Sequence, residues 1–198
     1  QLLPEGLEGG ISTSPISYRH WFSTEKKKAE AMEKATLHLL EVVEELAKIH
    51  QETGKLLHLD IEPEPDGILE NSEELIWLFD QWLVPKGRKI LPEKLNITAD
   101  ESEQLIKKHI QACYDVCHFA IVYETPADTF AKFAQAGIKI GKIQISAALK
   151  ALLPETPNAR FSLGKRLQEF AESTYLHQVV ARKEEGGYTS YADLPQAL

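Results

Sequence analysis

The sequence has few cysteines, no long apolar run and no signal-peptide pattern, and each of these lacks excludes a class of protein. The two cysteines, Cys113 and Cys117, lie four residues apart on one expected strand, too far for a relaxed disulfide. No apolar stretch approaches the ~20 residues that a membrane-spanning helix needs. A basic start, an apolar middle and a small-residue cleavage site are also missing. We therefore expect free thiols, no membrane span and a cytoplasmic location.

Basic clusters are scarce too, and the formal net charge is −8. A nucleic-acid-binding surface needs grouped lysine and arginine side chains to neutralise phosphates, so we expect no nucleic-acid partner. The three lysines at 26–28 are flanked by Glu25 and Glu30, which is typical of a solvated helix face. The chain begins with Gln1 instead of methionine, so we expect a processed, trimmed or partial form of a longer protein.

Three apolar runs that end in polar side chains give the fold class. The chain has 198 residues, of which 43% are hydrophobic, enough for one domain over residues 1–198 with its own core. Helix-like segments separate the three runs, and such alternation predicts a parallel sheet with its chemistry at the carboxyl ends of the strands. The runs are 56–63, 112–118 and 141–146.

Capping residues and apolar spacing predict the remaining elements. Gly54 is placed to end the first and longest helix. The stretch 85–98, with Pro85, Gly87 and Pro92, is expected to be irregular, either as a lid or as a surface excursion. The expected helices are 24–53, 71–84, 100–110, 125–137 and 163–171; the expected strands are 10–15, 55–62, 112–117 and 139–146, followed by a β-hairpin of 176–182 and 188–191.

On the first of the three runs, strand alternation puts His58, Asp60 and Glu62 on one face. Polar residues facing one way in an otherwise Leu/Ile strand are costly unless they pair with each other, with water or with a metal. A binding site and an internal hydrogen-bonded network both remain open. The strand-end position favours a site for Glu62, and the interior positions favour a network for His58 and Asp60.

The other two runs add donors of the same kind. Asp115 lies in a buried strand, where an aspartate is rare without a partner, and His118 follows three residues later. Gln144 and Ser146 share a face at the end of the third run. Carboxylate and amide oxygens suit Mg²⁺ or Mn²⁺, and Zn²⁺ becomes possible when a histidine joins. A separate Cys-x-x-x-Cys-His metal site, at residues 113–118, is a less favoured alternative.

Taken together, the motifs resemble the xylose isomerase-like TIM-barrel superfamily of sugar-phosphate isomerases and epimerases. Three stretches carry the resemblance, in the family's order: 60–63 (Asp-Ile-Glu-Pro), 115–118 (Asp-Val-Cys-His) and 141–146 (Gly-Lys-Ile-Gln-Ile-Ser). The resemblance implies an α/β fold of the (β/α)8 TIM-barrel class. Because that barrel takes ~250 residues, an incomplete barrel covering about strands 4–7, plus the C-terminal hairpin, is expected.

The resemblance also implies roles. Glu62, Asp115 and Gln144 would be ligands of a divalent metal, Mn²⁺ or Mg²⁺ with Zn²⁺ possible, and Glu62 and His118 would be catalytic. Substrate contacts are expected from four residues: His118, His58, Ser14 and Ser146. The family's second glutamate ligand, on its eighth strand, has no counterpart after Ser146.

Two functions follow as hypotheses. The first is an isomerase or epimerase that moves a proton next to the carbonyl of a small sugar or hydroxy-carbonyl metabolite. The second is a non-catalytic binding protein, because the stretches 12–18 and 114–118 are most similar to the EboE family of metabolite-traffic proteins. A DNA-cutting relative would want more histidines and basic loops, and the charge of −8 speaks against it. Exposed sheet edges would favour a homo-oligomer.

Overall fold

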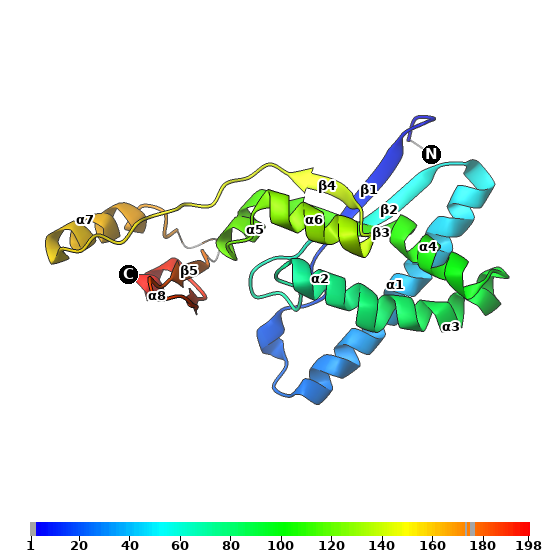
Figure 1. Ribbon diagram of the computed structural model, residues 1–198, viewed down its shortest axis with the longest axis horizontal. Helices are drawn as coiled ribbons and strands as arrows, with labels where there is room; N and C mark the ends of the chain where they lie inside the picture. Colours follow the sequence, from blue (N-terminus) through cyan, green and yellow to red (C-terminus); the bar gives the residue numbers. More distant parts are fainter. Residues whose placement is uncertain (1–2, 173, 175–176) are drawn as a thin grey trace.

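A computed structural model describes residues 3–172, 174 and 177–198. At its centre lies a four-stranded parallel sheet with the strand order β1-β2-β3-β4, curled into a half-barrel (Figure 1). A separate antiparallel hairpin is formed by β5 and β6 near the C-terminus. The strands are β1 (Glu8–Thr13), β2 (Leu56–Ile61), β3 (Ile110–Asp115), β4 (Ile140–Gln144), β5 (Val179–Arg182) and β6 (Tyr188–Tyr191).

The helices begin and end at the residues that local chemistry favours. Thr24 caps α1 by accepting a hydrogen bond from the Lys27 amide, and Gly54 ends that helix with φ of 71°. Thr98 and Glu101 form a reciprocal capping box at the start of α4. The helices are η1 (Arg19–Trp21), α1 (Glu25–Thr53), α2 (Ser72–Leu78), the π-helical turn η2 (Phe79–Leu83), α3 (Val84–Leu95), α4 (Ala99–His109), α5 (Val116–Ile121), α6 (Pro126–Ala136), α7 (Pro157–Gln168) and α8 (Leu194–Ala197).

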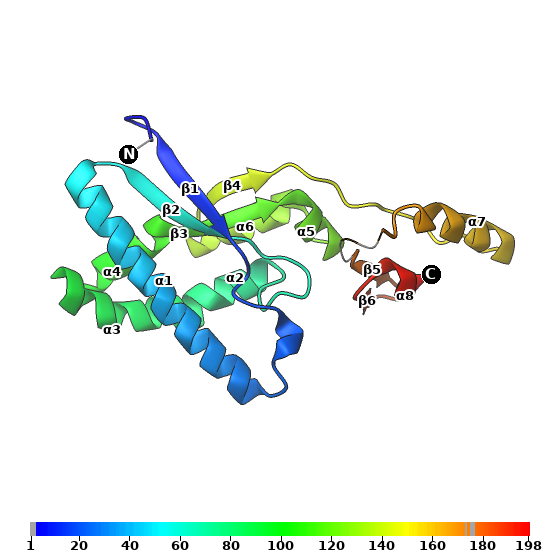
Figure 2. The ribbon, with the colours of Figure 1, turned by 180° about the vertical axis from the view of Figure 1, so that it is seen from behind.

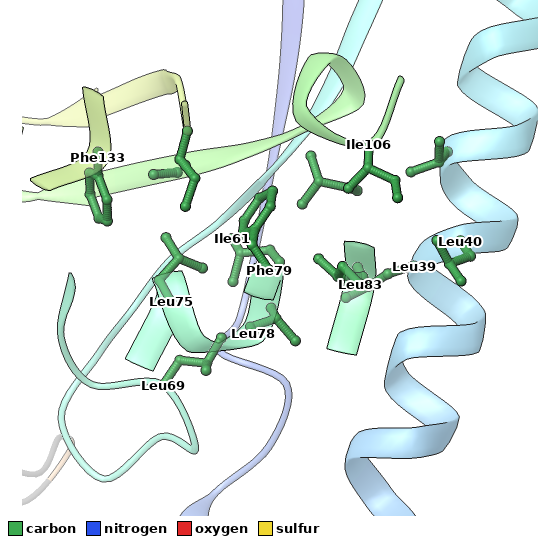
Figure 3. Close-up of a cluster of buried hydrophobic side chains, with 14 of the residues drawn as sticks. Leu39, Leu40, Ile61, Leu69, Leu75, Leu78, Phe79, Leu83, Ile106 and Phe133 are labelled. Atoms are coloured by element: carbon green, nitrogen blue, oxygen red, sulfur yellow. The ribbon is translucent and has the colours of Figure 1, made fainter. Parts of the chain in front are cut away.

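The hydrophobic core lies between one face of the sheet and the helices that cover it (Figure 3). Ile61 of β2 packs there with Leu75, Phe79 and Leu83, all of which are 1% exposed or less. Burying a side chain of this size contributes roughly 1.5–3 kcal/mol each. The opposite face of the sheet, called the inner face below, is polar; it carries Gly10, Ser12, His58, Asp60, Gln111, Cys113, Asp115, Lys142 and Gln144.

The predicted (β/α)8 TIM-barrel class is wrong. The described residues contain six strands, and two of them belong to the hairpin. A barrel closes only when its last strand pairs with its first, whereas β1 and β4 are the two ends of the strand order. After Gln144 the chain continues without regular structure to α7, which lies far from the sheet in both views (Figure 2).

Several boundaries also differ from the sequence prediction, among them that of the first strand, which is Glu8–Thr13 where 10–15 was expected. The stretch 85–98, predicted as irregular, is mostly the helix α3, because Pro85 falls in its first turn, where a missing N–H is tolerated. Gly87 is needed inside α3 since a Cβ there would lie 2.3 Å from Ile106 Cδ1. The predicted strand 112–117 is displaced to Ile110–Asp115, and the helix predicted at 163–171 is α7. The predicted start of the hairpin, residue 176, lies outside the described residues.

Within the part of the chain that the structure describes, no helix is both long enough and apolar enough to cross a bilayer. Both cysteines carry free thiols, as predicted. Self-association through the edges of β1 and β4 stays a prediction.

Candidate functional site

Glu62 directly follows β2 and points to the carboxyl end of the inner face. Its backbone N–H donates to the Thr13 carbonyl at 3.0 Å, which continues the β1–β2 ladder by one step and fixes the residue at the strand end. The side chain is 17% exposed. Its Oε2 accepts a long hydrogen bond from the Cys113 thiol at 3.6 Å, so Oε1 is left facing the neighbouring strands.

Asp115 ends β3 and caps α5, and its two carboxylate oxygens have different partners. Oδ1 accepts from the Cys117 amide at 3.0 Å, as an N-cap side chain does, and from the Ser146 hydroxyl at 2.5 Å. Oδ2 accepts from Gln144 Nε2 at 2.8 Å. Burial acts to raise the pKa of Asp115, but the hydrogen bonds from Ser146, Cys117 and Gln144 outweigh it and lower the pKa to about 2. The carboxylate is therefore ionised at neutral pH.

Gln144 lies on the inner face because of a β-bulge. The register between β3 and β4 shifts after Ala112, so that Lys142 pairs with Cys113 and Gln144 with Asp115. The Gln144 side-chain nitrogen then lies 2.7 Å from Glu62 Oε1 and 2.8 Å from Asp115 Oδ2. Two carboxylates from different strands thus converge on one point, as the strand-end motifs predicted.

His118, in the first turn of α5, completes the convergence. Its Nδ1 lies 3.2 Å from the Pro63 carbonyl and 3.4 Å from Glu62 Oε1. A carbonyl can only accept a hydrogen bond, so Nδ1 carries a proton in that contact, and in the neutral ring the lone pair is on Nε2.

Cys117 was predicted on the same strand as Cys113, and this is wrong. The strand ends at Asp115, and the turn into α5 moves Cys117 beside the Asp115 carboxylate instead. One donor atom from each of Asp115, Cys117 and His118 lies within 4.8 Å of the other two. We call Glu62, Asp115, Cys117, His118 and Gln144 the rim cluster.

Two of the predicted substrate-binding residues lie outside the rim cluster, while Ser146 touches it through Asp115. His58 is 3% exposed and lies deeper on the inner face, where its Nδ1 is 2.6 Å from Asp60 Oδ1. This agrees with the network interpretation of the pair. Ser14, by contrast, lines a depression of about 250 Å³ beside the ends of β1 and β2.

The depression is also lined by Tyr18, from the stretch 12–18, and by Trp21 and Glu64, which the sequence did not indicate. Trp21 is 76% exposed, and its ring meets that of Tyr18 edge-on at 5.9 Å. Burial is the largest influence that raises the pKa of Glu64, which also responds to the charges of His118, Glu62 and Asp115. The depression and the rim cluster are therefore electrostatic neighbours. The signal that could have found Glu64 is its position two residues after Glu62 in the same strand-end turn.

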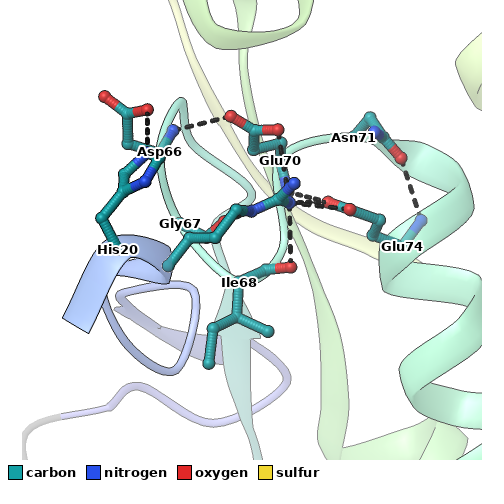
Figure 4. A network of polar contacts seen from close by, with 8 residues as sticks. His20, Asp66, Gly67, Ile68, Glu70, Asn71 and Glu74 are labelled. Carbon is teal, nitrogen blue, oxygen red and sulfur yellow. Dashed lines mark hydrogen bonds and ion pairs between the residues drawn. The ribbon is translucent and has the colours of Figure 1, made fainter. Parts of the chain in front are cut away.

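An arginine holds the wall of the depression in place (Figure 4). Arg19 donates from Nε to the Gly67 carbonyl at 3.0 Å, and one of its terminal nitrogens contacts both Glu74 oxygens at 2.7 and 2.8 Å. The same group lies 3.2 Å from Glu70. These contacts tie the segment after β1 to the segment after β2. Ile16, in that first segment, has φ of 75°, a region that β-branched residues rarely adopt.

The donor set of the rim cluster fits a divalent cation. Two carboxylates meet around a single hydrogen-bond donor, and rotation of the Gln144 amide by half a turn would present its oxygen to the same point. Three oxygen donors suit Mg²⁺ or Mn²⁺, and the lone pair of His118 with the Cys117 sulfur also suits Zn²⁺.

Comparisons with known proteins identify no family, so the interpretation of the rim cluster as a cation site rests on its geometry. A scan against protein-family models matches no family. A search of curated proteins finds no match. The resemblance to xylose isomerase-like proteins therefore stays a prediction.

Proposed function

We propose that the rim cluster binds a divalent cation and that Glu62 moves a proton next to the carbonyl of a small hydroxy-carbonyl metabolite, an isomerase or epimerase activity. One observation carries the proposal: Glu62 and Asp115, 53 positions apart, both contact the single side-chain nitrogen of Gln144. That nitrogen occupies the position that a cation would take between the two carboxylates. Glu62, Asp115 and Gln144 would hold the cation, which when bound polarises a carbonyl or hydroxyl oxygen.

The surroundings of Glu62 suit a general base. Asp115 accepts three hydrogen bonds and has a low pKa, so it serves as a fixed charge and does not exchange protons near neutral pH. Glu62 has fewer fixed partners, and the Cys113 thiol orients one of its oxygens. The Nδ1–H of His118 lies 3.4 Å from Glu62 Oε1, close enough to orient the carboxylate.

The depression supports a small substrate with several hydroxyl groups. Its volume of about 250 Å³ lies below the roughly 300–1,000 Å³ of pockets for drug-sized ligands. Ser14 and Ser17 offer hydroxyls, Glu64 offers a carboxylate, and Trp21 offers an exposed aromatic face. A sugar or short polyol uses all three kinds of contact.

A non-catalytic binding protein, of the kind that the likeness to the EboE metabolite-traffic family suggests, is the second candidate. The observation that favours it is that the Gln144 amide donates hydrogen bonds to both carboxylates. Such a site can bind hydroxyl groups without turnover. Epimerisation through two opposed bases would also require a second free carboxylate, and Asp115 is fully engaged.

The test measures proton exchange and binding separately. The full chain is incubated with MnCl₂ in D₂O and with short hydroxy-aldehydes and hydroxy-ketones, including glyceraldehyde, hydroxypyruvate and xylose, and NMR follows deuterium entering the carbon next to the carbonyl. For the enzyme, Glu62→Gln should lower this rate by about 10²–10⁴. Glu73→Gln is the matched control, since Glu73 is exposed on α2 away from the cluster.

The outcomes separate the two candidates. Exchange that depends on Glu62 and on the metal supports the enzyme. Saturable ligand binding without any exchange supports the binding protein and rejects the enzyme. If neither Mn²⁺ nor Zn²⁺ binds the wild-type chain in equilibrium dialysis, the cation proposal is wrong.

A further inference from the structure

The rim cluster contains one donor that the proposed function leaves unused, the thiol of Cys117. The turn from β3 into α5 brings it there: Asp115 accepts a hydrogen bond from the Cys117 amide, so the residue is held against the carboxylate that caps the helix. Ser146 also contacts this amide, at 2.9 Å. Cys117 is half-buried, whereas Cys113 is fully buried and bound to Glu62. The two thiols therefore have different surroundings.

The second observation is the orientation of His118. Its Nδ1 faces the Pro63 carbonyl at 3.2 Å, so in the neutral ring the lone pair is on Nε2. Metal-binding histidines are commonly oriented in this way, with one ring N–H donating to a carbonyl or carboxylate. A donor atom of His118 then lies within 4.8 Å of donor atoms of both Asp115 and Cys117.

We propose that Cys117 is a direct ligand of the cation, together with Asp115 and His118, and that the site therefore selects Zn²⁺ or another thiophilic ion over Mg²⁺ and Mn²⁺. The inference rests on the proposed function, because it concerns the same cation. Ligands of tetrahedral zinc lie about 3.5 Å from one another, given Zn–N and Zn–S bonds of about 2.0 and 2.3 Å. Since the three donor atoms lie within 4.8 Å of one another, they need to close by about 1 Å at most, a shift of the size that side-chain rotation gives.

Binding by the thiol has a defined proton balance. The S–H bond of Cys117 breaks, a bond from sulfur to the metal forms, and one proton is released to the buffer. A thiolate ligand favours Zn²⁺ and Co²⁺ over Mg²⁺ and Mn²⁺, whose preferred ligands are oxygens. Adding sulfur to the donor set thus changes which metal the chain retains.

Cobalt gives the direct test, because Co²⁺ bound to a thiolate shows an intense sulfur-to-metal charge-transfer band in the near ultraviolet. The full wild-type chain is titrated with Co²⁺ and bound metal is counted by equilibrium dialysis. The band should grow to one equivalent, disappear in Cys117→Ser and persist in Cys113→Ser. The Zn²⁺ affinity of Cys117→Ser should fall at least tenfold, while its Mn²⁺ affinity changes less.

A labelling experiment on the wild-type chain covers the case in which a variant fails to fold. Iodoacetamide should modify Cys117 in the metal-free chain, and Zn²⁺ should slow this modification at least tenfold, whereas Mg²⁺ should not. Cobalt bound without a charge-transfer band, or equal labelling of Cys117 with and without Zn²⁺, would overturn the role of Cys117 and leave an oxygen-ligated cation standing. No bound cobalt, zinc or manganese would overturn the proposed cation site as well.

Discussion

Gln144 and Glu62 are 82 positions apart in the sequence, and their side chains meet at 2.7 Å. The contact joins the residue after β2 to β4, and these two strands are not neighbours in the sheet. The same amide also donates to Asp115. Gln144 therefore offsets the repulsion between two carboxylates that would otherwise face each other. The position therefore decides whether the apo rim cluster is stable.

Replacing Gln144 with glutamate tests this balance. Gln144→Glu removes two hydrogen bonds to charged groups and adds a third negative charge, so the free energy of unfolding without metal should fall by about 2–4 kcal/mol. For a chain of this size that lowers the melting temperature by roughly 5–10 °C. Mn²⁺ should restore more stability to this variant than to the wild type, because three carboxylates bind a cation more tightly. Thermal unfolding followed by circular dichroism, with and without MnCl₂, measures both effects.

Gln144→Met is the matched control. It has nearly the same length but offers no donor and no charge, so it should lose stability without gaining from Mn²⁺. If both variants melt with the wild type in the absence of metal, the amide does not stabilise the apo cluster.

Two glycines allow the inner face to close around Asp60. A Cβ on Gly141 would lie 2.1 Å from Asp60 Oδ1, and a Cβ on Gly10 would lie 2.4 Å from Oδ2. Lys142 of β4 also reaches Ser12 of β1 at 2.9 Å, so the two edge strands approach each other across this face. The small residues, together with the bulge at Gly141, give the sheet its strong curl.

Gly141→Ala should therefore destabilise the chain by about 1–3 kcal/mol, the usual cost of forcing extra volume into a packed site. Urea unfolding measures the change. Gly164→Ala, in α7 with its nearest neighbour at 4.0 Å, should be neutral or stabilising by up to about 1 kcal/mol. Adding Asp60→Ala should recover part of the loss at position 141; a double variant no more stable than the single one would show that the clash is elsewhere.

The Arg19 contacts make a prediction about the wall of the depression. Arg19→Lys keeps the positive charge but cannot reach the Gly67 carbonyl and both Glu74 oxygens at once, since lysine lacks the planar fork. The variant should lose about 1–2 kcal/mol of stability. Hydrogen exchange should also speed up at the Arg19 amide, which donates to the Asp66 carbonyl at 2.7 Å. Unchanged protection of that amide in the lysine variant would show that the Arg19 contacts do not hold this segment in place.

The sequence could predict those parts of the structure that are determined by residues near one another in the chain. Helices α1 and α6 were predicted nearly to the residue, because Thr24, Gly54, Thr125 and Gly137 cap them within one turn. The convergence of Glu62 and Asp115 was also predictable, since parallel strands end at one edge. Their roles as ligands and base are still predictions.

The predictions that were wrong concern contacts between residues far apart in the sequence. The barrel was predicted from the strand-like motifs in the sequence. A barrel closes only if β1 and β4 pair, and no single segment of the sequence determines that pairing. The bulge that puts Gln144 on the inner face lies at Gly141, beside the Asp60 side chain of a strand that is distant in the sequence. Cys117 was assigned to the wrong element although Asp115 is a good N-cap residue, because the apolar run continued past it. Trp21 could not be selected, since its importance comes from a depression built by two separate segments.

The last prediction concerns pH. His109, the final residue of α4, is 0% exposed; its Nδ1 donates to the Leu57 carbonyl at 2.7 Å, and its Nε2 has no partner among the described residues. Burial lowers the pKa of this imidazole below its usual 6.5, so the folded chain holds it neutral. As the pH falls below about 6.5, the unfolded chain takes up a proton that the folded chain refuses, and stability must decrease. The stability that depends on a neutral His109 should therefore be present at pH 7 to 8 and be progressively lost from pH 6.5 downward.

His109→Asn isolates this effect, because the asparagine amide can keep the hydrogen bond to Leu57 but does not titrate. The variant should be less stable than the wild type at pH 7.5, by on the order of 1 kcal/mol, since the smaller side chain leaves space in the core. The difference between the two chains should then shrink as the pH is lowered from 7.5 to 5, because only the wild type pays for a buried imidazole there. Urea unfolding at four pH values across this range gives the two curves. Parallel curves would mean that His109 takes up its proton equally well in both states, and that burial does not disfavour its charged form.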